Sequence, residues 1–170
     1  PYTDDGGEDR GGVWILFMDD NGRVDQEQKI SADSGGFDGD LDNGDLFGSA
    51  LAGIGDLNGD GALDLVTGAP NDDTGGSERG AAWVLFLNDQ GRVRDQQKIA
   101  KDSGGFDGNL DDGDRFGSAV AEIGDVDGDG ISDIAVGAPA DAGNGTGPGE
   151  VWILFLNAEG RVRDQQRITK

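Results

Sequence analysis

The chain alternates between short apolar segments and polar stretches rich in glycine, aspartate and asparagine. Each apolar segment is about five to eight residues long, which is typical of strands and too short for most helices. Asp56–Gly61 and Asn88–Gly91 have the composition of turns that join neighbouring strands as hairpins. For the middle of the chain we therefore predict four strands, at Ser49–Ile54, Leu63–Ala69, Ala81–Leu87 and Val93–Ile99.

The whole pattern repeats with a period of 69 residues. Trp14, Trp83 and Trp152 mark three copies of one apolar segment that continues into Leu-Phe. The same offset relates Phe47-Gly48 to Phe116-Gly117 and Gly68-Ala69-Pro70 to Gly137-Ala138-Pro139. Self-similarity at a fixed period is typical of proteins that repeat one structural unit along the chain.

We interpret the chain as a half unit over residues 1–33 and two complete units over residues 34–100 and 101–170. Four-stranded antiparallel units of this kind usually form propeller blades, of which about four to eight surround a central axis. The predicted fold is therefore all-β, with two complete blades and one half blade that do not close a ring by themselves. A neighbouring copy could supply the two strands that the half blade lacks, in a head-to-tail assembly.

Composition narrows the chemistry to oxygen ligands and hard cations. The formal net charge is −22, from 35 acidic and 13 basic residues, so nucleic acid and anionic membranes are repelled and cations are favoured. The chain has no cysteine, which excludes disulfides and thiolate metal sites. It also has no histidine, the commonest general base and transition-metal ligand.

Two acidic loops stand at the same place in the two complete units: Asp56–Asp64, the first acidic loop, and Asp125–Asp133, the second acidic loop. Each has oxygen donors at positions 1, 3, 5 and 9, a glycine at position 6 that permits a sharp turn, and a position 7 carbonyl that can join the donors. Calcium prefers such a set of about six to eight oxygens, whereas magnesium demands tighter octahedral geometry. The predicted ligands of two Ca²⁺ sites are Asp56, Asn58, Asp60, Ala62 and Asp64, and Asp125, Asp127, Asp129, Ile131 and Asp133.

Neither loop is an EF-hand, which requires a glutamate at position 12 between two helices. Position 12 is Thr67 in one loop and Val136 in the other, and the flanking segments are predicted strands. The alternative is that aspartate, asparagine and glycine only build a tight hairpin by bonding their own backbone. That alternative does not explain the acid at position 9 of both loops.

Phe47-Gly48-Ser49, the first acidic loop and Gly68-Ala69-Pro70 together resemble an FG-GAP repeat, the blade unit of the integrin α-subunit propeller. The second complete unit is similar in the same way, and tandem repeats with a Trp-containing strand such as Val151–Leu156 occur in secreted bacterial proteins. The resemblance implies propeller-type blades and calcium on the ten predicted ligands.

The aromatic residues have two interpretations. The three tryptophans lie in continuous apolar strands, where burial between blades is a simpler use than stacking on sugars. The polar segments Asn71–Gly80 and Lys101–Asp114 lack periodicity and are predicted to be loops. Aromatic residues available for ligand recognition in loops are only Tyr2, Phe37 and Phe106.

Two further features remain open. Asn144-Gly145-Thr146 is an N-glycosylation sequon in a glycine-rich segment, so Asn144 is a candidate glycan attachment site. The segments Asp38–Asp45 and Asp107–Asp114 could hold further cations, but solvated turns explain the same composition without a ligand.

The function that these observations favour is a non-enzymatic, calcium-stabilised structural or adhesive protein that assembles head to tail with copies of itself into a fibre or oligomer. The alternative is a fragment of an integrin-like propeller that binds a glycan or a surface protein. An enzyme is a weaker hypothesis, because the carboxylate pairs that a glycosidase would need are already assigned to the acidic loops.

We expect an extracellular, secreted or cell-surface protein. Millimolar external calcium suits such loops, and no apolar run approaches the roughly 18 residues of a membrane span. The sequence begins at Pro1 without a charged and apolar leader, so we expect that any signal peptide has been removed or lies outside it.

Overall fold

The computed structural model describes residues 2–139 and 149–169, and the described residues contain strands, turns and loops without any helix. No described segment is therefore a long apolar helix that could cross a membrane. The strands are β1 (Val13–Met18), β2 (Val24–Ile30), β3 (Leu51–Gly55), β4 (Asp64–Ala69), β5 (Ala81–Leu87), β6 (Val93–Ala100), β7 (Ala119–Gly124), β8 (Asp133–Ala138), β9 (Glu150–Leu156) and β10 (Val162–Ile168).

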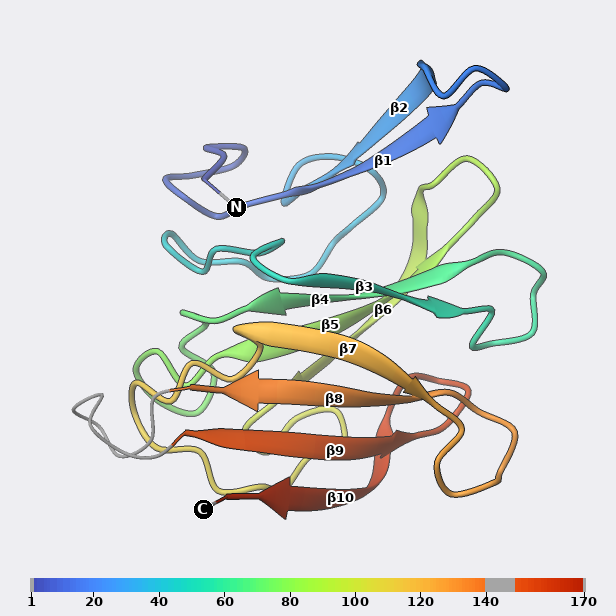
Figure 1. Ribbon diagram of the computed structural model, residues 1–170. Helices are drawn as coiled ribbons and strands as arrows, with labels where there is room; N and C mark the ends of the chain where they lie inside the picture. Colours follow the sequence, from blue (N-terminus) through green and yellow to red (C-terminus); the bar gives the residue numbers. More distant parts are fainter. Residues whose placement is uncertain (1, 140–148, 170) are drawn as a thin grey trace.

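The strands form three antiparallel sheets that follow one another along the chain (Figure 1). The first sheet contains β1 and β2, the second runs in the order β3-β4-β5-β6, and the third runs in the order β7-β8-β9-β10. The predicted all-β fold with four-stranded antiparallel units in an open row is confirmed. The strands of the second sheet lie within two residues of their predicted bounds.

Apolar side chains that alternate along the central strands fill the spaces between the sheets. All seven residues of β5 are buried, which is the pattern of a strand covered on both faces. Trp83, Leu85 and Leu87 belong to a core cluster with Val13 of β1. Val84 belongs to a second cluster with residues of β9, on the other face of β5. The second sheet is therefore the middle layer of a stack (Figure 1).

An aromatic trio repeats at both junctions between sheets. The ring of Phe106 lies 5.0 Å from that of Phe116 and 5.0 Å from that of Trp152, which it meets edge-on. Phe37 makes the equivalent contacts one repeat earlier. Phe37 and Phe106 are only 5% and 1% exposed, so neither of these two loop aromatics is available for ligand recognition. Both side chains pack into the core and so anchor their loops to it.

Burial of the tryptophans between sheets is confirmed at two of the three positions. Trp83 and Trp152 are each 4% exposed, whereas Trp14 is 48% exposed. No described segment covers the face of β1 that carries Trp14, so this indole packs only partly. A cationic side chain lies over each ring, for example Lys98 at 5.2 Å from the ring centre of Trp83.

The Phe-Gly and Gly-Ala-Pro segments of adjacent sheets meet at the junctions. Gly80 and Phe116 form a parallel bridge between the second and third sheets. The N–H of Gly117 donates to the carbonyl oxygen of Gly137 at 3.1 Å within the third sheet. A Cβ atom on Gly68 would lie 1.8 Å from the carbonyl oxygen of Gly117, so only glycine allows the two backbones to approach.

This close approach predicts that a glycine-to-alanine substitution has a large effect at one position and a small effect at the equivalent position of the next repeat. Gly68→Ala should lower the free energy of unfolding by at least about 2 kcal/mol, because the added methyl group collides with backbone. Gly137→Ala should change it by less than about 1 kcal/mol, because its Cβ would make an ordinary 3.4 Å contact with Ala119. Urea denaturation measures the free energy of unfolding of both variants. Equal losses would contradict the close backbone contact at Gly68.

Candidate metal centre

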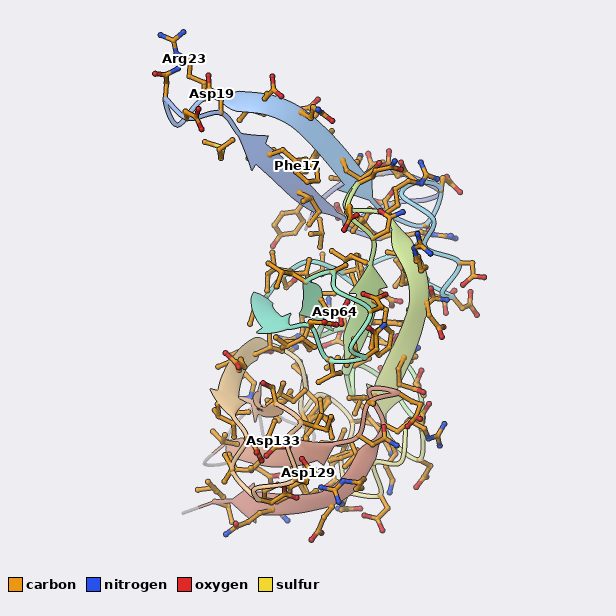
Figure 2. All side chains as sticks on the ribbon, turned by 90° about the vertical axis from the view of Figure 1, so that its right-hand side faces the viewer. Phe17, Asp19, Arg23, Asp64, Asp129 and Asp133 are labelled. Atoms are coloured by element: carbon orange, nitrogen blue, oxygen red, sulfur yellow. The ribbon has the colours of Figure 1, made fainter. Side chains whose placement is uncertain are left out.

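The two acidic loops connect the first two strands of each four-stranded sheet. The first acidic loop joins β3 to β4 and the second joins β7 to β8, so both lie at corresponding ends of stacked sheets (Figure 1). Figure 2 shows Asp64 in the middle sheet, and Asp129 and Asp133 in the C-terminal sheet. One hollow is lined by residues of both loops, including Asn58 and Ile131. The loops are therefore neighbours in space as well as equivalents in sequence.

Glycines give both loops their shape. Gly59 and Gly61 have φ angles of 75° and 94°, and Gly128 and Gly130 have φ angles of 81° and 90°. These left-handed conformations suit glycine, which has no Cβ atom to collide with the neighbouring carbonyl. The alternating glycines allow the chain to turn tightly, so that the intervening acidic side chains fold over the loop backbone.

The acidic side chains of the first acidic loop accept hydrogen bonds from the loop backbone. Asp56 accepts from the N–H groups of Asp60 and Gly61, each at 2.9 Å. The amide oxygen of Asn58 also accepts from the N–H of Asp60, and Asp60 in turn accepts from that of Ala62, each at 2.9 Å. These bonds hold three oxygen-bearing side chains close to the loop backbone.

The second acidic loop repeats this arrangement. Asp125 accepts from the N–H groups of Gly128, Asp129 and Gly130 at 2.7, 3.0 and 2.9 Å. Asp129 accepts from the N–H of Ile131 at 2.8 Å. The shared pattern of bonds shows that the sequence repeat extends to the orientation of the side chains.

The aspartate at position 9 has a structural role that is not apparent from the sequence. Asp64 is fully buried, and its two carboxylate oxygens accept from the N–H of Leu57 at 2.9 Å and from that of Leu87 at 3.0 Å. Asp133 does the same with Val126 at 2.9 Å and Leu156 at 3.1 Å. Each carboxylate ties the start of its loop to the end of the central strand.

Burial raises the pKa of the Asp64 carboxyl, because the charged form loses solvation. The hydrogen bonds from Leu87 and Leu57 act in the opposite direction, and the charge of Asp60 adds to the increase. A neighbouring cation would favour the ionised form of this carboxyl.

The geometry of the second acidic loop fits a calcium ion. Asp125, Asp127 and Asp133 each offer a carboxylate oxygen, and these oxygens lie within 4.8 Å of one another. Calcium–oxygen distances are about 2.3–2.6 Å, so two oxygens on opposite sides of one ion lie about 4.6–5.2 Å apart. The three oxygens can therefore reach a common ion with small adjustments.

The first acidic loop differs at position 3, where Asn58 stands in place of Asp127. It offers three carboxylates and one amide oxygen, and all four side chains belong to the predicted ligand set. The position 7 residues, Ala62 and Ile131, lie buried and half-buried at the base of their loops. Their carbonyl groups remain predicted ligands.

The other acidic segments are held by their own backbone. The N–H of Asp42 donates to Asp45 at 2.8 Å, and that of Asp111 donates to Asp114 at 2.7 Å. Burial raises the pKa of Asp45 to about 6, and the nearby charge of Asp72 adds to the increase. Hydrogen bonding within turns therefore accounts for the positions of Asp45 and Asp114. Asn144, the candidate glycosylation site, lies outside the described residues.

Comparison with known proteins assigns the repeated unit. The family model described as the FG-GAP repeat matches residues 47–85 and 116–154. Each match runs from the Phe-Gly pair through an acidic loop to the central strand of its sheet. The chain therefore contains two FG-GAP repeats.

Its relatives include integrin α subunits. The chain is 33% identical over 158 residues to integrin alpha-3 of Mus musculus, an alignment that covers 93% of this chain and 13% of the relative. It is 38% identical over 122 residues to integrin alpha-PS5 of Drosophila melanogaster, covering 72% of this chain and 11% of the relative. It is also 35% identical over 116 residues to the phosphatidylinositol-glycan-specific phospholipase D of Rattus norvegicus, covering 67% and 14%. The chain thus spans only about a tenth to a seventh of these relatives.

Removal of the buried aspartate at position 9 should lower the stability of the fold even without metal. Asp64→Ala should lower the free energy of unfolding by about 3 kcal/mol in the presence of a chelator, because two buried N–H groups lose their acceptor. Asp60→Ala, at an exposed position of the same loop, should cost about 1 kcal/mol or less. Urea denaturation in EDTA measures both, and similar losses for the two variants would refute the structural role of Asp64.

Proposed function

We propose that this is a non-enzymatic, calcium-stabilised repeat protein with a structural or adhesive role outside the cell. The observation that carries the proposal is the pair of acidic loops, each of which directs oxygen donors to the concave side of a tight turn. In the second acidic loop, oxygens of Asp125, Asp127 and Asp133 lie close enough to share one calcium ion. Likeness to integrin α subunits supports an adhesive role over a catalytic one.

Calcium is favoured over magnesium by the donor set. Magnesium keeps several waters and requires near-ideal octahedral geometry, whereas each acidic loop offers several carboxylate and amide oxygens on a flexible turn. Calcium would neutralise part of the net charge of −22 and hold the β3–β4 and β7–β8 hairpins closed. Millimolar external calcium would keep loops of moderate affinity filled, which supports an extracellular location.

Two other functions have less support. A glycan- or protein-binding propeller fragment would need exposed aromatic or polar anchors in its loops, but Phe37 and Phe106 are buried, and Tyr2 is the loop aromatic that remains exposed. A hydrolase would need a free carboxylate pair, but Asp64 and Asp133 are engaged by backbone amides. The match to the phospholipase covers only 14% of that protein, so it does not support a phospholipase activity for this chain.

The stability of the chain should depend specifically on calcium. We expect millimolar calcium to raise the melting temperature of the chelator-treated protein by about 5 °C or more, because binding to the folded state alone stabilises it by mass action. Sodium chloride at equal ionic strength is the control, since any salt screens the excess negative charge.

The matched variant is the double substitution Asp56→Asn and Asp125→Asn, which keeps one of the two acceptor oxygens that each carboxylate offers to the loop amides. It should lose most of the increment produced by calcium and keep the increment produced by salt. Differential scanning fluorimetry measures both. Equal increments from calcium and from salt in the unmodified protein would rule out calcium-specific stabilisation.

The two outer sheets of the stack present complementary apolar faces, which supports the head-to-tail part of the proposal. Trp14, Leu16 and Met18 on β1 are 48%, 51% and 56% exposed, although their counterparts on β5 are buried. On β9, Val151 is 41% exposed, and the counterpart row of β5 is buried against the third sheet. These are the two kinds of face that meet at the junctions inside the chain.

We therefore propose that the β9 face of one copy docks on the β1 face of the next. The internal junctions are the template: an apolar row of one sheet packs on the tryptophan-bearing row of the sheet that follows it. A contact between two different faces is heterologous, so repeated docking gives a ring if the rotation closes and a fibre if it does not.

Assembly should respond to a charge placed on either outer face. Leu16→Asp or Val151→Asp should leave the chain monomeric in calcium, because each places a carboxylate in the proposed contact. Leu51→Asp is the control, since Leu51 is 48% exposed on the edge strand β3 of the middle sheet. Sedimentation velocity measures the mass. A monomer at high concentration before any substitution would contradict head-to-tail assembly.

A further inference from the structure

The β9–β10 hairpin contains an arginine at an irregular point of the sheet. Val162 pairs with Leu156 and Asp164 pairs with Phe155, so Arg163 is the extra residue of a β-bulge. Arg94 occupies the same bulge between β5 and β6. A bulge redirects its side chain out of the regular alternation of the strand, and such positions often point side chains at functional sites.

Arg163 reaches from its bulge into the second acidic loop. Its Nη2 atom lies 2.6 Å from Oδ2 of Asp127 and 2.6 Å from Oδ2 of Asp129. Its Nε atom donates to the carbonyl oxygen of Leu156 at 3.1 Å, which fixes the guanidinium beside the loop. The two carboxylates use their Oδ1 atoms for the loop amides of Asp129 and Ile131. Arg163 therefore binds the oxygens that the backbone leaves available.

Arg94 does not make the equivalent contacts. It lines a hollow together with Asp60 and Asn88, but it forms no ion pair with any of the described residues. In the first acidic loop, Asn58 instead donates from its side-chain nitrogen to Oδ2 of Asp60 at 3.3 Å. An amide at position 3 therefore takes the oxygen that the guanidinium takes in the second acidic loop.

The difference follows the charge of the two loops. The second acidic loop has aspartate at positions 1, 3, 5 and 9, whereas the first has asparagine at position 3 and so one carboxylate fewer. Four carboxylates in one turn repel each other, and a nearby guanidinium lowers that repulsion. A cation bound by the same turn would lower it too, so the guanidinium and the cation compete for Asp127 and Asp129.

We propose that Arg163 is a built-in counter-ion that competes with calcium for the second acidic loop and lowers the calcium affinity of that loop. The proposal rests on the proposed calcium function. The two loops are then not equivalent: calcium can enter the first without displacing an arginine, whereas it must displace Arg163 from Asp127 and Asp129 to enter the second. Filling of the second acidic loop is coupled in this way to release of the β10 bulge.

The test isolates the second acidic loop by using a background with Asp56→Asn and Asp60→Asn, which removes two carboxylates from the first. Isothermal titration calorimetry with calcium chloride then measures the affinity of the second acidic loop. Adding Arg163→Gln should tighten calcium binding about tenfold, because two ion pairs no longer oppose it. Arg163→Lys keeps the charge but loses the forked geometry, and should give a smaller gain.

The matched control is Arg94→Gln in the same background. It removes the same charge from the same position of the repeat, and it should change the affinity by less than about twofold because Arg94 contacts neither Asp127 nor Asp129. An equal gain from Arg94→Gln and Arg163→Gln would show a general charge effect and overturn the proposal.

The remaining outcomes distinguish a failure of the role of Arg163 from a failure of the proposed calcium function. Unchanged affinity in Arg163→Gln, with calcium bound before and after the substitution, overturns the role of Arg163 and leaves the calcium function intact. Binding that becomes measurable only in Arg163→Gln supports the proposal. Absence of calcium binding in the unmodified protein and in every variant overturns the calcium function, and the role of Arg163 with it.

Discussion

One buried aspartate in each complete sheet receives backbone hydrogen bonds from two distant segments, and the geometry of the acidic loop depends on it. Asp64 joins the start of its loop at Leu57 to the end of the central strand at Leu87. These two bonds restrain the conformation of the tight turn, in which the other acidic side chains fold over the loop backbone. The two amide donors offset part of the cost of burying this charge, whereas removal of the carboxylate leaves both donors unsatisfied.

The stack of sheets provides the setting for this interaction. The chain is highly charged and rich in glycine, so no single sheet has a large core of its own. β5 is covered on both faces, and each junction adds an aromatic trio of the kind that surrounds Phe106. The glycines of the repeat let the backbones of adjacent sheets touch, as at Gly68 and Gly117. Loop geometry and stacking therefore arise from the same repeated unit.

Local sequence patterns predicted the positions of strands and loops, because these depend mainly on neighbouring residues. Apolar segments placed the strands of the second sheet to within two residues, and the 69-residue period located both acidic loops. The polar neighbours of Phe106 correctly placed it in a loop, but they gave no sign that its ring is buried in the core. The bond between Asp64 and Leu87 crosses from one hairpin to the next, and the direction of the Arg163 side chain depends on a bulge. Neither feature can be read from the alternation of apolar and polar residues.

We propose that both acidic loops hold calcium in a structural role. Anomalous scattering from a crystal grown in calcium chloride and measured at long wavelength tests it most directly. We expect one anomalous peak in each loop, with oxygens of Asp56 and Asp60 in the first, and of Asp125 and Asp133 in the second, within about 2.6 Å of the ion. Well-ordered loops that contain water and no anomalous peak would contradict it.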